Sequence, residues 1–140
     1  MIYHGNRIKI KEGVSLEEGR AALELLETAG REIPVVESYV VGQDVGGDYD
    51  FGAVFVLKDL DAYWEYLVHP THLTAERVGI PLMAKFEAFD ITDDPDPDFQ
   101  VKVAELQRRH VEADPELAAL MAALPVNLGS SALPGTSSAV

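Results

Sequence analysis

The sequence predicts an α+β fold, in which a sheet with helices occupies the first two thirds of the chain and helices form a separate tail. Residues 2–10 and 85–91 alternate between apolar and polar side chains, which is typical of strands with one buried face. Residues 16–31 instead repeat apolar side chains every three or four positions, as an amphipathic helix does. An acidic, proline-rich stretch at residues 93–99, DDPDPDF, then separates this part from the tail.

Local signals set the limits of the elements between these segments. Ser15 and Glu18 form a capping-box pattern at the start of the first helix, and Pro34 follows its end. Asp59 is a suitable N-cap for a short helix, which Pro70 interrupts. The expected strands are residues 2–10, 35–42, 51–57 and 85–91, and the expected helices are residues 16–31, 59–66 and 71–83.

The element order over residues 1–92 is β-α-β-β-α-β, the ferredoxin-like split βαβ arrangement. Both helices would cover one face of the sheet and leave the other face open. Apolar residues such as Val54, Phe55 and Phe89 supply more apolar surface than one helix layer would hide. We therefore expect a homodimer in which two sheets pack face to face and form a barrel.

Residues 93–140 are expected to form an acidic linker, two helices and a flexible tail. Residues 99–111 have a helical pattern, and Asp114 with Pro115 predicts the start of a second, strongly apolar helix. That helix should lie on the barrel or on a partner subunit. His110 is expected to be exposed, and the small-residue segment GSSALPGTSSAV at the end is expected to be mobile.

Composition excludes several classes of function. The formal net charge is −13, which disfavours nucleic acid and anionic membrane surfaces as partners. The chain has no cysteine, which excludes disulfides, thiolate catalysis and cysteine–zinc sites. No apolar run is long enough to span a membrane, and MIYHGNRIKIK lacks a signal-peptide core, so we expect a cytoplasmic protein.

The stretch EYLVHPTHL at residues 65–73 contains two histidines and permits three interpretations. A metal site at His69 and His72 is disfavoured, because Pro70 restricts His69 away from helical geometry and only His4 or Glu65 could supply a third ligand. We therefore predict no metal, and no cofactor motif is present.

The second interpretation is acid–base chemistry by Tyr66 and His72. A histidine can remove a proton near neutral pH, and a tyrosine hydroxyl can stabilise the enolate oxygen that results. The third interpretation is structural, with these side chains merely holding the helix break. We assign that structural role to His69 and Pro70, since the His69 ring can satisfy backbone groups where Pro70 lacks an N–H.

Residues 60–73, LDAYWEYLVHPTHL, with their Tyr-x-x-His-Pro-x-His motif, resemble the stress-responsive A/B barrel (Dabb) family of dimeric α+β barrels. The segments YHGNRIKIK, IPVVESYVVGQD and FEAFDI support this resemblance, which covers about residues 1–92. The nearest functional comparison is with polyketide cyclases of the olivetolic acid cyclase type. The resemblance implies a small cofactor-independent cyclase or lyase acting on a polyketide-like or other carbonyl substrate. The alternative is a non-catalytic, stress-associated or small-ligand-binding barrel.

The resemblance also implies roles for individual residues. Tyr66 and His72 match the catalytic tyrosine and histidine of such cyclases, and His4 matches a pocket histidine. Leu26 and Phe51 stand where those cyclases have a tyrosine and a histidine, so the pocket here should be more apolar. Tyr39 and Tyr49 are weaker candidates for substrate contact, and the alternative is that they are packing residues. Residues 93–140 are additional to the family pattern and could close the mouth of the pocket or reach across the dimer.

Overall fold

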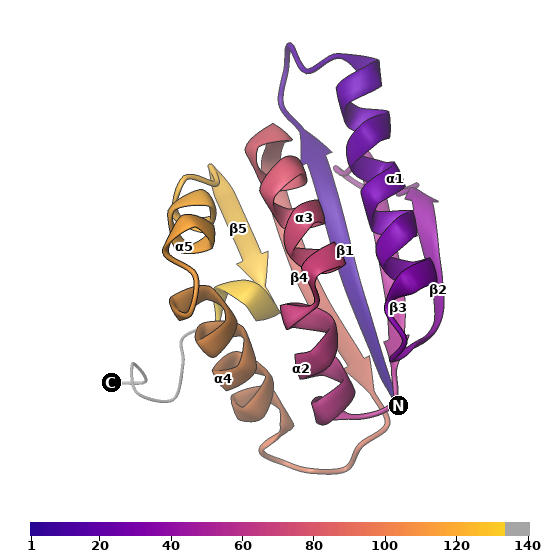
Figure 1. The fold of residues 1–140 in the computed structure, drawn as a ribbon, viewed down its shortest axis with the longest axis vertical. Helices are drawn as coiled ribbons and strands as arrows, with labels where there is room; N and C mark the ends of the chain where they lie inside the picture. Colours follow the sequence, from indigo (N-terminus) through magenta and orange to yellow (C-terminus); the bar gives the residue numbers. More distant parts are fainter. Residues whose placement is uncertain (134–140) are drawn as a thin grey trace.

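The structure is a computed structural model that describes residues 1–133. It consists of a five-stranded sheet in the order β2-β3-β1-β4-β5, with the helices packed against one face (Figure 1). The elements are β1 (Ile2–Ile10), α1 (Leu16–Glu32), β2 (Val36–Gln43), β3 (Phe51–Leu57), α2 (Leu60–Val68), α3 (Pro70–Gly79), β4 (Met83–Thr92), α4 (Phe99–Glu112), α5 (Pro115–Ala122) and β5 (Val126–Gly129). The ferredoxin-like α+β fold predicted from the sequence is therefore confirmed, with a helical C-terminal extension.

The central strand β1 pairs antiparallel with both β3 and β4. Its even-numbered residues face the helices, and Ile2 and Ile8 are buried there. His4 and Asn6 occupy the same inward face between them and are also buried. Because buried polar side chains are uncommon, this pair already marks the inner face of β1 as unusual.

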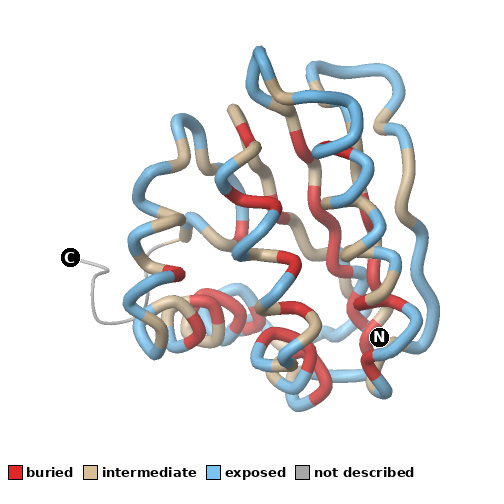
Figure 2. Tube along the Cα trace, turned by 45° about the horizontal axis from the view of Figure 1, so that its top comes forward, coloured by how far each residue is buried: buried red, intermediate tan, exposed pale blue. Residues whose placement is uncertain are grey.

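Helix starts follow the capping signals in the sequence. The capping box of Ser15 and Glu18 is present at α1, and the Asp59 side chain accepts a hydrogen bond from the Ala62 backbone N–H at α2. At α5, the Asp114 side chain accepts bonds from two backbone N–H groups in the first turn. Figure 2 shows buried positions along the central strands and along the helix sides that face them.

Three expectations for the second half of the chain are corrected by the structure. The helix predicted to reach residue 83 ends at Gly79; a 3-10 turn follows over Ile80–Leu82, and β4 begins at Met83. A fifth strand, β5, pairs in parallel with β4 where only tail was expected. His110 is buried, with 3% of its surface exposed, because it lies against Glu76 and His72 of α3. The mobile segment expected at the end lies partly outside the described residues, and Ser130–Ala132 form a 3-10 turn.

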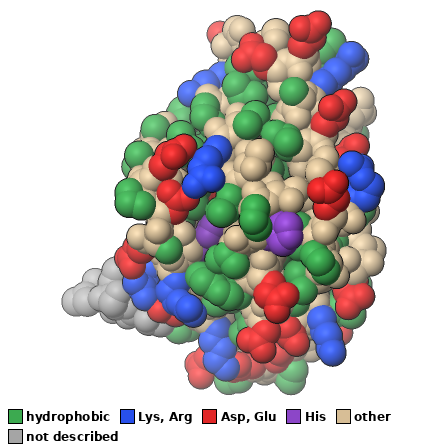
Figure 3. Space-filling view, viewed as in Figure 1, with side chains coloured by type: hydrophobic (Ala, Val, Ile, Leu, Met, Phe, Trp, Pro, Cys, Tyr) green, Lys and Arg blue, Asp and Glu red, His purple; other side chains and the backbone are tan. Residues whose placement is uncertain are grey.

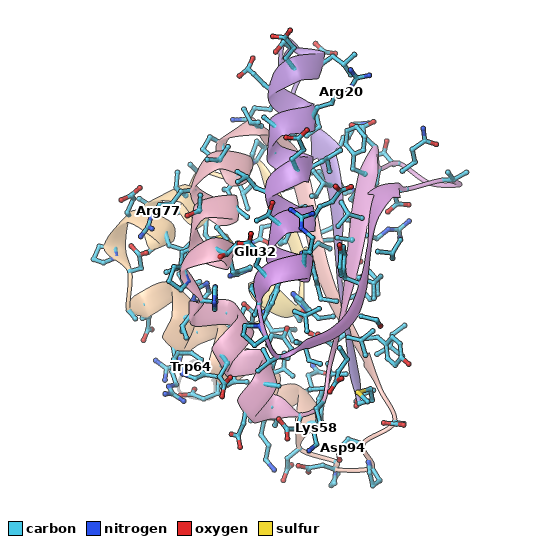
Figure 4. All side chains as sticks on the ribbon, turned by 45° about the vertical axis from the view of Figure 1, so that its right-hand side comes forward. Arg20, Glu32, Lys58, Trp64, Arg77 and Asp94 are labelled. Atoms are coloured by element: carbon cyan, nitrogen blue, oxygen red, sulfur yellow. The ribbon has the colours of Figure 1, made fainter. Side chains whose placement is uncertain are left out.

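The extension is attached to the domain by polar contacts as well as by β5. The Arg109 guanidinium lies over the Trp64 ring, 4.4 Å from its centre, and joins α4 to α2. Arg77 on α3 donates to the Asp114 carboxylate at 2.7 Å, which holds the start of α5. Figure 4 labels Trp64 and Arg77 on the side of the domain that faces the extension. Among residues 1–133, no helix combines the length and apolar character that membrane spanning requires.

The other face of the sheet carries no helix. Its central part is apolar, and Tyr3, Val40 and Ile91 are 47%, 61% and 64% exposed there. The Phe89 ring lies directly over Gly5, where an added Cβ would be 2.1 Å from the ring, so only glycine fits.

One end of this open face is polar. Arg7 donates two hydrogen bonds to Asp44, and its guanidinium lies 4.7 Å from the centre of the Tyr49 ring. Arg7 and His4 are thus on opposite faces of β1, as their odd spacing predicts.

Candidate functional site

A cavity lies between the sheet, the helices and the C-terminal extension. Its polar lining consists of His4, Asn6, His72, Glu76, Gln107, His110 and Ser131. Its volume is about 60 Å³, which is room for roughly four to six water molecules. Gln107 and His110 come from α4, so the extension closes this cavity from within the same chain.

His72 lies on α3 and is oriented by the break between α2 and α3. Its Nδ1 is 2.8 Å from the Leu67 backbone carbonyl oxygen, which can only accept a hydrogen bond. Nδ1 therefore carries the proton in the neutral ring, and Nε2 retains its lone pair. Burial lowers the pKa of His72, although the Glu76 carboxylate opposes this shift. The ring is thus a neutral base at the cavity wall.

Tyr66 lies between His72 and His4, with ring centres 4.5 Å and 5.7 Å away. It is fully buried, and no hydrogen bond of normal geometry reaches its hydroxyl within the described chain. Burial raises the pKa of Tyr66 well above its ordinary value, and the neighbouring Asn6 side chain offsets this only in part. The hydroxyl therefore stays protonated and can donate a hydrogen bond. It lies behind the cavity lining rather than in it.

His4 belongs to a second group of buried polar side chains at the other end of the cavity. Its Nδ1 lies 2.8 Å from Asp90 Oδ1, and the Tyr63 hydroxyl donates to Asp90 Oδ2 at 3.0 Å. Gln107 of the extension donates to the same hydroxyl at 3.0 Å. Burial would raise the pKa of Asp90, but the nearby His4 and hydrogen bonds from Ser130 and Tyr63 together outweigh this effect, and the pKa is lowered. No sequence motif singles out Asp90, Tyr63 or Gln107 as site residues.

Glu76 connects His72 to the extension. Its Oε1 lies 3.2 Å from His72 Nδ1 and 2.8 Å from His110 Nε2. Among the described residues, these three side chains form the one group with the composition and proximity of a metal site. The spacing of His72 and Glu76, four residues apart on one helix, could have indicated this pair. His110 could not have been found this way, because it is distant in sequence.

The remaining predicted site residues are placed as follows. Leu26 lines the cavity, whereas Phe51 lines a neighbouring small apolar hollow. Tyr39 packs on Gly30 and Phe55, outside the cavity lining. Tyr49 lies beyond the opposite face of the sheet, where its hydroxyl donates to Glu87 at 2.6 Å.

The break between α2 and α3 is built by His69 and Pro70. Pro70 occupies the first turn of α3, where a missing backbone N–H leaves no intrahelical bond unmade. His69 is the N-cap, and its Nδ1 accepts a hydrogen bond from the Thr71 backbone N–H at 3.2 Å. This arrangement turns α3 so that His72 lies beneath the end of α2.

The motif and the fold agree with a comparison against protein families. The model of the stress responsive A/B barrel domain matches residues 2–93. The chain belongs to the stress-responsive A/B barrel family. This confirms the resemblance drawn from the Tyr-x-x-His-Pro-x-His motif, and it leaves residues 94–140 outside the matched range. No curated protein matches the chain significantly.

Several solved structures share the A/B barrel fold. A dimeric ferredoxin-like protein of unknown function from Thermobifida fusca is 26% identical, with a TM-score of 0.60, and the match covers 65% of this chain and 89% of that one. A hydroxynitrile lyase from Passiflora edulis is 12% identical, with a TM-score of 0.59 and coverage of 66% and 94%. SnoaB, a cofactor-independent oxygenase from Streptomyces nogalater, is 18% identical, with a TM-score of 0.55 and coverage of 69% and 96%.

Proposed function

We propose that this protein is a small cofactor-independent enzyme of the cyclase or lyase type, which acts on a carbonyl substrate by enolisation. The observation that carries the proposal is the pairing of a fixed His72 tautomer with an unpartnered Tyr66 hydroxyl beside a closed cavity. The Leu67 carbonyl holds the proton on Nδ1, so Nε2 is the free base. The Tyr66 hydroxyl is buried without a partner, which is costly for folding but suits a donor reserved for a ligand.

The proposed reaction follows from these two groups. His72 Nε2 removes a proton from the carbon next to the substrate carbonyl, and the electron pair moves onto the carbonyl oxygen. Tyr66 donates a hydrogen bond to that oxygen as its negative charge develops, once the side chains that separate its hydroxyl from the cavity have moved aside. The enolate carbon then bonds to a second carbonyl carbon of the same substrate, and the imidazolium returns its proton to the new alkoxide. Read in reverse, the same steps cleave a carbon–carbon bond.

The size of the cavity restricts the substrate. Space for roughly four to six water molecules accepts a carbonyl compound of a few non-hydrogen atoms. A linear polyketide would enter only if the extension, which supplies Gln107 and His110 to the lining, moved aside. We therefore place a small β-hydroxy ketone or aldehyde, cleaved by the reverse steps, ahead of a long polyketide as the substrate class, because a molecule of that size is too short to close a ring on itself.

Exchange of the protons next to a ketone carbonyl tests the enolisation directly. Butanone in deuterated buffer with a chelator, followed by proton NMR, should lose its α-proton signal faster with the protein than without it. Tyr66→Phe and His72→Gln should each slow the exchange by roughly 10²- to 10⁴-fold, the usual contribution of one acid–base group. Glu65→Gln, an exposed position on the same stretch, should retain the rate. If the wild-type protein does not accelerate exchange, or if both variants exchange as fast as it does, the alternative of a non-catalytic ligand-binding barrel is favoured.

We also propose that the protein is a homodimer formed through the open face of the sheet. Tyr3, Val40 and Ile91 leave an apolar surface exposed there, and apolar surface of this kind is typical of interfaces. The structural neighbour from Thermobifida fusca is described as dimeric. Light scattering coupled to size exclusion should give twice the chain mass, and a monomeric mass at micromolar concentration would contradict the proposal.

A further inference from the structure

The His72, Glu76 and His110 side chains form a polar group that the acid–base proposal uses only in part. His72 and Glu76 are one helical turn apart on α3, so their side chains share a face. His110 approaches from α4, across the cavity wall. One nitrogen of each ring and one carboxylate oxygen lie within 4.8 Å of one another. We propose that these three residues bind a divalent first-row transition ion.

The separations between the ligand atoms suit a common ion. Two ligands that lie about 2.1 Å from an ion are about 3.0 Å apart at right angles and about 3.4 Å apart at the tetrahedral angle that zinc prefers. Glu76 Oε1 lies 2.8 Å from His110 Nε2 and 3.2 Å from His72 Nδ1, so the ligand atoms would move apart by a few tenths of an ångström to hold zinc. The Leu67 carbonyl oxygen, 2.8 Å from His72 Nδ1, is near enough to become a fourth ligand.

The charges around the group favour a cation. Glu76 supplies one negative charge, and neither lysine nor arginine is found among the residues that line the cavity. Both histidines are at least 92% buried on their side chains, so an ion there would be weakly screened. Glu76 keeps 17% of its side chain exposed, which gives access from solvent. Acidic and basic side chains are interspersed over this face of the molecule (Figure 3).

The ligand types indicate which ions would bind. Two imidazoles and one carboxylate are the ligand set of many catalytic zinc sites and of the facial triad that holds non-haem iron. Mg²⁺ and Ca²⁺ prefer oxygen ligands throughout and should bind poorly. Because His72 and Glu76 face the cavity with His110, the open coordination positions would point to the space where a substrate binds.

Ion binding and the base role of His72 exclude each other. An ion on Nδ1 requires the proton of the neutral ring to move to Nε2, which then has no lone pair to accept a substrate proton. An ion on Nε2 would occupy that lone pair directly. The ion would therefore inhibit enolisation, and removal of the ion would restore it. The ion site itself does not depend on the acid–base function.

Calorimetric titration of the tag-free chain with zinc chloride tests the site. The wild-type protein should bind one zinc ion per chain, and magnesium at the same concentration should give no binding. Glu76→Gln and His110→Asn should each weaken zinc affinity at least about tenfold, since even partners outside the coordination sphere are worth that much. Glu65→Gln, which removes an exposed carboxylate outside the group, should retain the wild-type affinity. Circular dichroism without zinc checks that each variant is folded.

Two results would overturn the ion site: no zinc binding by the folded wild-type chain, or equal affinity in Glu76→Gln, His110→Asn and the wild type. Equal weakening by Glu65→Gln would likewise place the zinc elsewhere. Zinc should also suppress butanone exchange in the wild type but not in His110→Asn, and stimulation by zinc would refute the mutual exclusion. The titration uses no substrate, so failure of the ion site and failure of the enolisation proposal are separately visible.

Discussion

Two tyrosines three residues apart on α2 should respond to the same substitution with opposite changes in stability. Tyr66 and Tyr63 are both fully buried. The Tyr66 hydroxyl has no hydrogen-bond partner within the described chain, and such a group costs about 1–3 kcal/mol. Tyr66→Phe removes that cost and leaves a void of only one oxygen atom. We expect the free energy of unfolding to rise by about 1–2 kcal/mol.

Tyr63→Phe removes an equally buried hydroxyl that both donates and accepts a hydrogen bond. That hydroxyl donates to Asp90 and accepts from Gln107. Both partners are buried and would be left short of a hydrogen bond, and one of them is a carboxylate. Bonds to charged groups are worth about 1.5–3 kcal/mol, so the free energy of unfolding should fall by at least that amount. The two variants should therefore differ by roughly 3–5 kcal/mol.

Urea unfolding followed by tryptophan fluorescence measures both changes, because Trp64 is the single tryptophan and lies on the same helix. Protein concentration must be equal in all samples, since a dimer unfolds in a concentration-dependent way. A Tyr66→Phe protein that is less stable than the wild type would refute the reasoning, because it would mean that the hydroxyl has a stabilising partner. The same variant should be inactive in butanone exchange, so that stability and activity change in opposite directions.

Three further predictions concern the extension, acid stability and the open sheet face. Gly129→Ala should destabilise the protein by at least about 2 kcal/mol more than Gly46→Ala, as measured by urea unfolding. Both glycines have positive φ, so the backbone strain of the substitution is common to them. Only at Gly129 would the added Cβ also meet backbone, 1.8 Å from the Ala88 carbonyl oxygen. Equal losses would contradict a steric role. Since the pKa of Asp90 is lowered on folding, its contribution to stability is present above the ordinary value of 3.8 and is lost as pH falls through the folded pKa. The urea concentration at the midpoint of unfolding should therefore fall less steeply with decreasing pH in Asp90→Asn than in the wild type. An equal slope in the two proteins would contradict this prediction. Val40→Asp should convert the dimer to monomer in size exclusion with light scattering, and an unchanged mass would exclude this face as the interface.

The fold of residues 1–92 was predictable because its signals are local. Strand alternation, the capping box at Ser15 and the cap at Asp59 each act within a few residues. The position of β5 was not predictable, because four residues of the tail become a strand only when β4 offers its free edge. The same reason explains His110. A histidine on a helix of mixed polarity is predicted to be exposed. His110 is buried because it faces Glu76, and that partner lies 34 residues earlier in the chain.

The candidate site was predictable in part. The motif located Tyr66 and His72, and strand parity could have added Asn6, which shares the inward face of β1 with His4. The partners that fix each ring were not evident. His72 depends on a backbone carbonyl, which carries no sequence signal, and His4 depends on Asp90, whose position opposite it follows from the register of β1 and β4.

The place of β5 beside β4 also limits how copies of this chain can associate by strand pairing. A sheet with two long open edges can add chains without end, whereas the four-residue β5 covers Lys85–Ala88 of β4, so the longest uncovered edge is β2. Pairing through one edge gives a closed pair of chains and cannot propagate into a fibre. The four residues of β5, Val126–Gly129, attach the extension to the sheet and therefore also reduce the edge that is open to aggregation.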